Sequence, residues 1–204
     1  MHISEGILAT PLLGGAWAAA AAGLVYGMRR TQPEDMPRVA LCSAAFFVVT
    51  FVRIPLGPAH LHLAATGLVG ILLGWRAFPA LLVALLLQAV LFQFGGLAVL
   101  GANTVVMALP AVGAYYLYRR WSRSADPRRI AVAAGAVGAL AITGNVLIMA
   151  AFLLLTDRAF AVPALGVLLF HVPLMLVEGV VTALAVAFLF KVRRDLLPNP
   201  EGPP

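Results

Sequence analysis

The chain has 204 residues, of which 62% are hydrophobic and 11% are charged, and its mean hydropathy is +0.99. This composition excludes an ordinary soluble fold and, because Cys42 is the single cysteine, a disulfide scaffold. The formal net charge of +6 does not indicate nucleic-acid binding, since the basic residues stand in short clusters between apolar segments.

The first residues, MHISEGILATPLLGG, do not have the positively charged start of a secretory signal peptide, and Glu5 makes them slightly acidic. We therefore expect Met1 and His2 to be retained in the mature protein.

Seven apolar segments follow along the chain, separated by proline, glycine and charged residues. They cover residues 10–28, 38–52, 61–75, 78–93, 100–118, 130–155 and 161–190. Since about 20 apolar residues cross a membrane as a helix, we expect an all-α polytopic protein with about seven transmembrane helices. One membrane domain is expected over residues 1–195, followed by a short cytoplasmic tail at 196–204.

The basic residues predict the orientation of these helices. Of the 14 lysines and arginines, all except Arg53 and Arg158 fall on one side of the expected topology. Cytoplasmic loops are rich in lysine and arginine, so we expect the N-terminus outside and the C-terminus in the cytoplasm.

The first apolar segment contains two rows of small residues at intervals of four. The rows are Gly15, Ala19, Gly23 and Gly14, Ala18, Ala22. Small side chains let another helix approach closely. Packing within the chain is one interpretation, and an interface with a partner is the other.

The histidines are the candidate metal ligands, and all four are expected in the outer half of the protein. At the N-terminus, the Met1 amine, the His2 amide nitrogen and the His2 imidazole can wrap one metal in adjoining chelate rings. A fourth nitrogen, for which His62 is the candidate, would complete a planar site suited to Ni(II) or Cu(II) rather than Zn(II). Many proteins begin with Met-His without binding metal. His60 and His62 would point about 200° apart on the helix expected there, so both cannot face one site.

Asn103 and Glu178 are two further polar residues of interest. We expect Asn103 near the histidines, whereas Glu178 lies within an apolar segment. Asn103 ends the glycine-containing outer connection 93–104, which could form a lid, and it could hydrogen-bond a ligating imidazole or cap the fifth helix. Glu178 lies within the last apolar segment, where a carboxylate needs a partner. A structural hydrogen bond to a neighbouring helix is the favoured role, and ion passage is the alternative.

Four segments together resemble the CbiM/NikM family: MHISEGIL at the start, HLAATGLVGILLG at 62–74, LFQFGGLAVLGANTVVM at 91–107 and HVPLMLVEGVVTA at 171–183. Members of this family are substrate-binding S components of energy-coupling factor importers for cobalt and nickel, in prokaryotic cell membranes. The resemblance implies Ni²⁺ or Co²⁺ as the transported substrate, no organic cofactor, and metal ligands at Met1, His2 and His62. His60 is then at most an accessory residue. The implied partners are a transmembrane coupling subunit, two ATPase subunits and a small accessory membrane protein.

Other functions are weighed against this one. The chain has no G-x-x-x-x-G-K-[ST] loop, so we expect ATP hydrolysis on partner subunits and no enzyme here. A membrane haem protein, with His62 or His60 and His171 as axial ligands, and a vitamin-specific S component are the alternatives. An intramembrane metalloprotease is disfavoured because no H-E-x-x-H motif is present.

Overall fold

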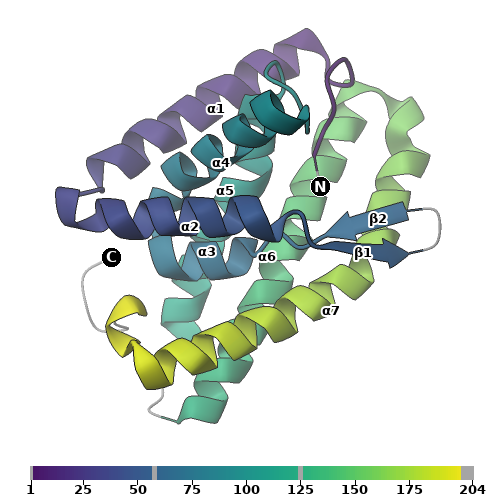
Figure 1. The fold of residues 1–204 in the computed structure, drawn as a ribbon. Helices are drawn as coiled ribbons and strands as arrows, with labels where there is room; N and C mark the ends of the chain where they lie inside the picture. Colours follow the sequence, from purple (N-terminus) through teal and green to yellow (C-terminus); the bar gives the residue numbers. More distant parts are fainter. Residues whose placement is uncertain (1, 57–58, 124–125, 199–204) are drawn as a thin grey trace.

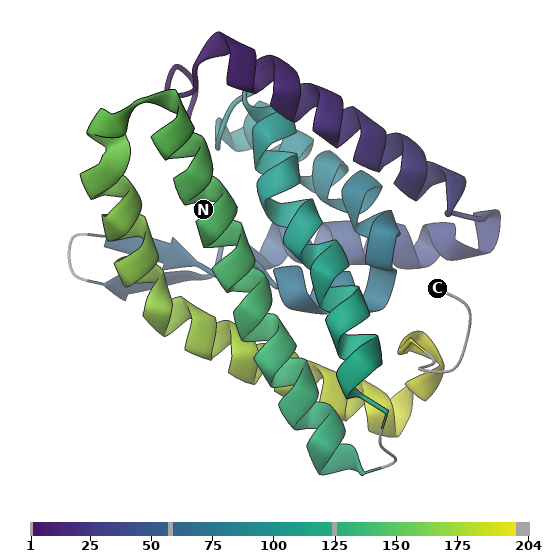
Figure 2. The same ribbon diagram turned by 180° about the vertical axis from the view of Figure 1, so that it is seen from behind.

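The structure, a computed structural model, describes residues 2–56, 59–123 and 126–198. Seven α-helices in these residues pack into one bundle (Figure 1, Figure 2). They are α1 Thr10–Arg29, α2 Met36–Val49, α3 Thr66–Leu73, α4 Ala77–Phe92, α5 Leu100–Trp121, α6 Pro127–Thr156 and α7 Ala161–Val192. Four short 3-10 helices accompany them: η1 Pro33–Asp35, η2 Gly74–Arg76, η3 Arg158–Phe160 and η4 Arg194–Leu196. The predicted all-α polytopic membrane class is confirmed.

A β-hairpin between α2 and α3 was not predicted. Strand β1, Arg53–Leu56, pairs antiparallel with β2, Ala59–His62, and places Arg53 opposite His62. The prediction that a helix begins at residue 61 is therefore wrong, since α3 begins at Thr66. The physical reason is the RIPLGP sequence, in which proline removes a backbone donor and holds the preceding residue in an extended conformation.

The hairpin also changes the argument about the two neighbouring histidines. Positions two apart in a strand share a face, so the helical argument that His60 and His62 must point apart does not hold. The side chain of His60 lies outside the part of the chain whose side chains the structure describes.

Two ends of the bundle can be distinguished by their polar contacts. At one end, Arg76 forms an ion pair with Asp35 at 2.8 Å and its Nε donates to the carbonyl oxygen of Arg30 at 2.9 Å. At the other end, the Gln88 amide donates to the Thr50 hydroxyl at 2.7 Å. Residues 77–92 thus lead from the first end back to the second, and the chain reverses direction at η2, between α3 and α4.

Helix α3 has only eight residues, and residues 62–65 precede it as irregular backbone that ends in the left-handed Ala65. Among the described residues, length and hydropathy alone give five helical segments able to cross a membrane: Thr10–Arg29, Thr66–Phe92, Leu100–Trp121, Pro127–Thr156 and Arg158–Val192. The second of these contains the fold at η2, and α2 has 14 residues. The number of membrane crossings and the outward N-terminus stay predictions.

Glycine allows α3 to lie deep in the bundle. A Cβ at Gly70 would collide with the carbonyl oxygen of Ala111 in α5, and one at Gly67 would lie 2.6 Å from Cα of Gly138 in α6. Helix α3 can therefore touch the backbones of both neighbours, as small residues permit in membrane proteins. This packing holds α3 against α5 and α6, and the residues just before it lie against α7.

Most of the small residues in the two rows of α1 are exposed and do not pack within the chain. The buried face of α1 consists of Ala16, Ala20, Gly23 and Gly27. Of the two rows identified from the sequence, Gly23 is buried, whereas Gly14, Gly15, Ala18, Ala19 and Ala22 are exposed. The interpretation of these rows as internal packing is thus wrong except at Gly23, because α1 turns a different face to α4 and α5.

Candidate metal-binding site

The residues before α1 enter the bundle in an extended path. Ile3 is 1% exposed, and its backbone is held at both polar atoms by one side chain. The amide of Ile3 donates to Asn103 Oδ1 at 2.8 Å, and Asn103 Nδ2 donates to the carbonyl oxygen of Ile3 at 3.0 Å. Asn103 therefore has neither role predicted for it: it holds the backbone beside His2, while Val99 occupies the N-cap of α5 without a side-chain capping bond.

The loop between α4 and α5 packs on this N-terminal segment. Glu5 donates its amide to the carbonyl oxygen of Gly95 at 3.2 Å and accepts from the amide of Ala98 at 3.0 Å. Gly95 and Gly96 have φ of +79° and +132°, and a Cβ at Gly96 would collide with the Glu5 side chain. Gly95 and Gly96 are thus needed here because both have a positive φ and because a side chain at Gly96 would displace Glu5.

His2 and His62, which are 60 positions apart in sequence, lie together at this end of the bundle. Their ring centroids are 5.3 Å apart, with 32° between the ring planes. His2 is carried by the clamped N-terminal segment, and His62 ends strand β2. Two nitrogen ligands of one metal ion at about 2 Å each would bring two imidazoles to a separation of this order.

The Gln88 side chain fixes the orientation of the His2 ring. Thr50 donates its hydroxyl to the carbonyl oxygen of Phe47 at 2.7 Å and accepts from Gln88 Nε2, which turns Gln88 Oε1 toward His2 Nε2 at 3.0 Å. An amide oxygen accepts, so His2 Nε2 carries the proton and Nδ1 has the lone pair. This is the tautomer in which Nδ1 and the His2 amide nitrogen can close a six-membered ring on a metal.

Burial keeps the His2 ring uncharged. It holds the pKa of His2 well below its usual value, and electrostatic interaction with the N-terminal amine and with His62 lowers the pKa further. The hydrogen bond to Gln88 acts in the opposite direction. A neutral imidazole is the form that binds metals, so this end of the bundle favours metal over proton at neutral pH.

Glu178 holds the backbone that follows His62. Its carboxylate, fully buried on α7, accepts from the amides of Ala64 and Ala65, the latter at 3.0 Å to each oxygen. Ala65 has a φ of 48°, a left-handed conformation that a side chain adopts at a cost. The favoured role of Glu178, a structural hydrogen bond, is the one observed, although its partner is the irregular backbone before α3 and not a helix. Irregular backbone at membrane depth needs such internal partners.

Not every predicted ligand can be located. Met1 and the side chain of His60 lie outside what the structure describes. The imidazole of His171 on α7 is hydrogen-bonded by Nδ1 to the carbonyl oxygen of Val167 at 2.7 Å. Over the described residues, no group of three histidine, cysteine or carboxylate side chains could hold a metal ion. His2 and His62 are the two histidines that the described residues bring together here.

The family of the chain follows from comparison with known proteins. The model of the family described as CbiM, the cobalt uptake substrate-specific transmembrane region, matches residues 2–196. The chain belongs to the CbiM family. It is 37% identical over 208 residues to a protein of Haemophilus influenzae, covering 99% of both chains.

Other members and a solved structure agree with the family assignment. The chain is 36% identical over 143 residues to the fused nickel transport protein NikMN of Rhodobacter capsulatus, with 65% of this chain and 41% of that protein aligned. A crystal structure of a transition metal transporter superposes with a TM-score of 0.74 at 28% identity, covering 94% of this chain and 93% of the other. The family is a membrane component of metal transport and not an enzyme family, which also argues against the haem and vitamin alternatives.

Proposed function

We propose that this chain is the substrate-binding S component of an energy-coupling factor importer, and that it captures Ni²⁺ or Co²⁺ at the outer face of a prokaryotic cell membrane. The observation that carries the proposal is the meeting of His2 and His62 at 5.3 Å, at the end of an N-terminal segment held by Asn103. Family membership supplies the metal-transport setting.

The proposed ligands are the amine of Met1, the amide nitrogen and Nδ1 of His2, and Nε2 of His62. Hydrogen bonding supports the two imidazole assignments. His2 Nε2 is bound to Gln88, and His62 Nδ1 lies 3.1 Å from the carbonyl oxygen of Leu63, so the lone pairs fall on the other ring nitrogens. Four nitrogens in one plane suit Ni(II) and Cu(II), and availability of the metal would set what is carried in the cell.

Transport also requires partners, which we propose to be a membrane coupling subunit, two ATPase subunits and a small accessory membrane protein. The exposed small residues of α1 support a docking face for the coupling subunit. A Cβ at Gly14 or Gly15 would meet nothing within 4 Å, so another helix can lie against this side of α1. Co-purification of the chain with its coupling subunit, lost on Ala18→Leu, would test this face.

The experiment that tests the proposed site compares two N-termini. Protein with its native first residue, verified by intact mass, is titrated with Ni(II) beside a variant that carries two extra residues before Met1. The extension removes the amine from position, so we expect Ni(II) binding and the visible absorption of a planar nickel–amide complex to be lost. Co(II) is titrated in the same way.

Both proteins should show the same thermal unfolding in detergent, because the extension alters only the terminal ligand. Equal Ni(II) affinity of the extended and native proteins would rule out chelation by the terminal amine. A haem-type Soret absorption in the purified protein would support the alternative of a haem carrier.

A further inference from the structure

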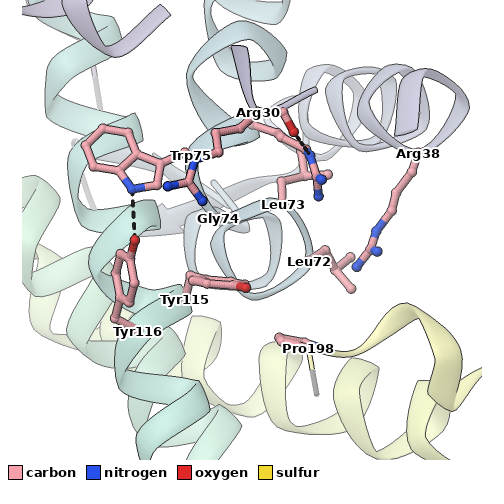
Figure 3. A pocket seen from close by; sticks show the side chains of 10 residues that line it. Arg30, Arg38, Leu72, Leu73, Gly74, Trp75, Tyr115, Tyr116 and Pro198 are labelled. Atoms are coloured by element: carbon pink, nitrogen blue, oxygen red, sulfur yellow. Dashed lines mark hydrogen bonds between the residues drawn. The ribbon is translucent and has the colours of Figure 1, made fainter. Parts of the chain in front are cut away.

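A cavity lies at the end of the bundle opposite His2 and His62. Its volume is about 120 Å³, and it forms where the end of α1, the start of α2, η2, α5 and the C-terminal residues meet (Figure 3). Its lining includes Arg30, Arg38 and Arg76 together with Tyr115 and Tyr116. The proposed capture of metal at the other end gives these residues no role.

The charges around this cavity favour an anion. Arg76 is paired with Asp35 at 2.8 Å, whereas Arg38 donates one Nη to the carbonyl oxygen of Leu196, a neutral acceptor. The Nε of Arg38 is buried and, within the described residues, has no hydrogen-bond partner. Figure 3 shows the Arg38 side chain extending from its helix toward Leu72, on the side of the cavity where Pro198 lies. A buried guanidinium N–H gains most from an anionic acceptor.

Aromatic residues place this cavity at the level of lipid headgroups. Trp75 donates its indole N–H to Tyr116 at 3.0 Å, and its ring lies edge-on to Tyr26 with centroids 4.6 Å apart. Tryptophan and tyrosine beside arginine are typical of the boundary between hydrocarbon and water. An anion bound here would therefore be within reach of the polar surface of the membrane.

An apolar groove of about 640 Å³ between α1, α2 and α4, lined by Met28, Met36 and Val39, opens on another face of α2 and shares no lining residue with the basic cavity. The headgroup of a lipid, and not its acyl chain, is therefore the part that the basic cavity would hold. Basic pockets between transmembrane helices bind such headgroups.

We propose that the basic cavity formed by Arg30, Arg38 and Arg76 binds the phosphate group of an anionic phospholipid. Arg38 is the main contact because its Nε has no acceptor among the described residues. Inorganic phosphate shares the recognised chemistry, and Trp75 and Tyr116 beside the cavity, which are typical of the membrane boundary, favour the lipid as its source. The lipid would join the α1–α2 connection to the C-terminal segment that Arg38 already contacts.

The test uses the full chain in detergent and native mass spectrometry. The protein is offered phosphatidylglycerol, phosphatidylcholine or inorganic phosphate, and each is also tested for stabilisation against heat. The variant is Arg38→Gln, and the matched control is Arg120→Gln, which removes the same charge from the exposed end of α5. We expect phosphatidylglycerol to bind in preference to phosphatidylcholine, with an affinity about tenfold lower in the variant and unchanged in the control.

Competition on the unaltered protein keeps the test valid if Arg38→Gln unfolds: phosphatidylglycerol should displace phosphatidylcholine. Binding of inorganic phosphate with the same dependence on Arg38, and without any lipid preference, would support the phosphate site and assign its source to solution. Equal loss in the variant and the control would mean attraction to general positive charge and would overturn the proposal, as would absence of lipid preference together with absence of phosphate binding.

Discussion

Gln88 connects the proposed metal site to the interior of the bundle. Its amide joins His2 to Thr50, and its own side chain is fully buried in α4. Because residues that orient a ligating imidazole strongly affect metal affinity, Gln88 should matter nearly as much as a ligand.

We predict that Gln88→Leu lowers Ni(II) affinity about 10- to 100-fold, since His2 can then turn and adopt the other tautomer. The measurement is a Ni(II) titration of the purified variant. Thr143→Val is the control, because the Thr143 hydroxyl bonds within α6 and to Met175. Unchanged affinity in Gln88→Leu would show that the amide does not orient His2.

The sequence indicated part of this site. His2 and His62 were identified from chelate chemistry and from the family resemblance, and they do lie together. Gln88 and Thr50 were missed, although Gln88 is the one polar residue in the apolar stretch LLVALLLQAVLF, which was the available signal. The actual contact of Asn103 could not be predicted, because it depends on where a segment 100 residues away enters the bundle.

At the scale of elements, α7 controls the start of α3. The Glu178 carboxylate is the acceptor for two successive amides of residues 64–65, and it therefore sets the path of the chain between His62 and Thr66. A movement of α7 would therefore displace the backbone next to His62 through this contact.

Glu178→Gln should destabilise the protein by about 1–3 kcal/mol, because the backbone N–H groups of Ala64 and Ala65 lose the negative charge of their acceptor and one of its two oxygens becomes an NH₂ group. We also expect weaker Ni(II) binding, since His62 loses its fixed support. Thermal unfolding and metal titration in detergent measure the two effects. Glu34→Gln, at an exposed position of η1, makes the same change of charge and should alter neither. Normal stability of Glu178→Gln would contradict the role given to the carboxylate.

The helices were largely predictable from hydropathy, and the segment between α2 and α3 was not. Six of the expected segments begin within three residues of α1, α2, α4, α5, α6 and α7. Residues 53–65 contain apolar residues without a clear period, and the described part depends on Pro55 in β1 and on Glu178 from a distant helix. Tertiary contacts of this kind leave no local pattern in the sequence.

For the whole molecule, the separation of the two polar ends supports the predicted orientation. Arg30 and Arg76 meet at the end opposite His2, which the positive-inside rule would place in the cytoplasm. The candidate metal site would then face the outside and the basic cavity the inner leaflet.

Labelling with a membrane-impermeant maleimide tests this orientation in intact cells. In a Cys42→Ala background, we expect Arg158→Cys to react from outside and Arg129→Cys to react only after the membrane is opened. Both positions are exposed in the structure, so accessibility differs by side of the membrane and not by burial. The reverse labelling pattern would refute the outward N-terminus and the site's external location.

The most direct test of the proposed metal site is a metal titration of the untagged, detergent-purified protein beside His62→Ala, with Ni(II) and Co(II) each offered in turn. We expect about one metal ion per chain for the native protein and loss of that binding in the variant, because planar coordination lacks its fourth nitrogen without His62. Equal binding by the two proteins, or no binding by either, would contradict a site formed by His2 and His62.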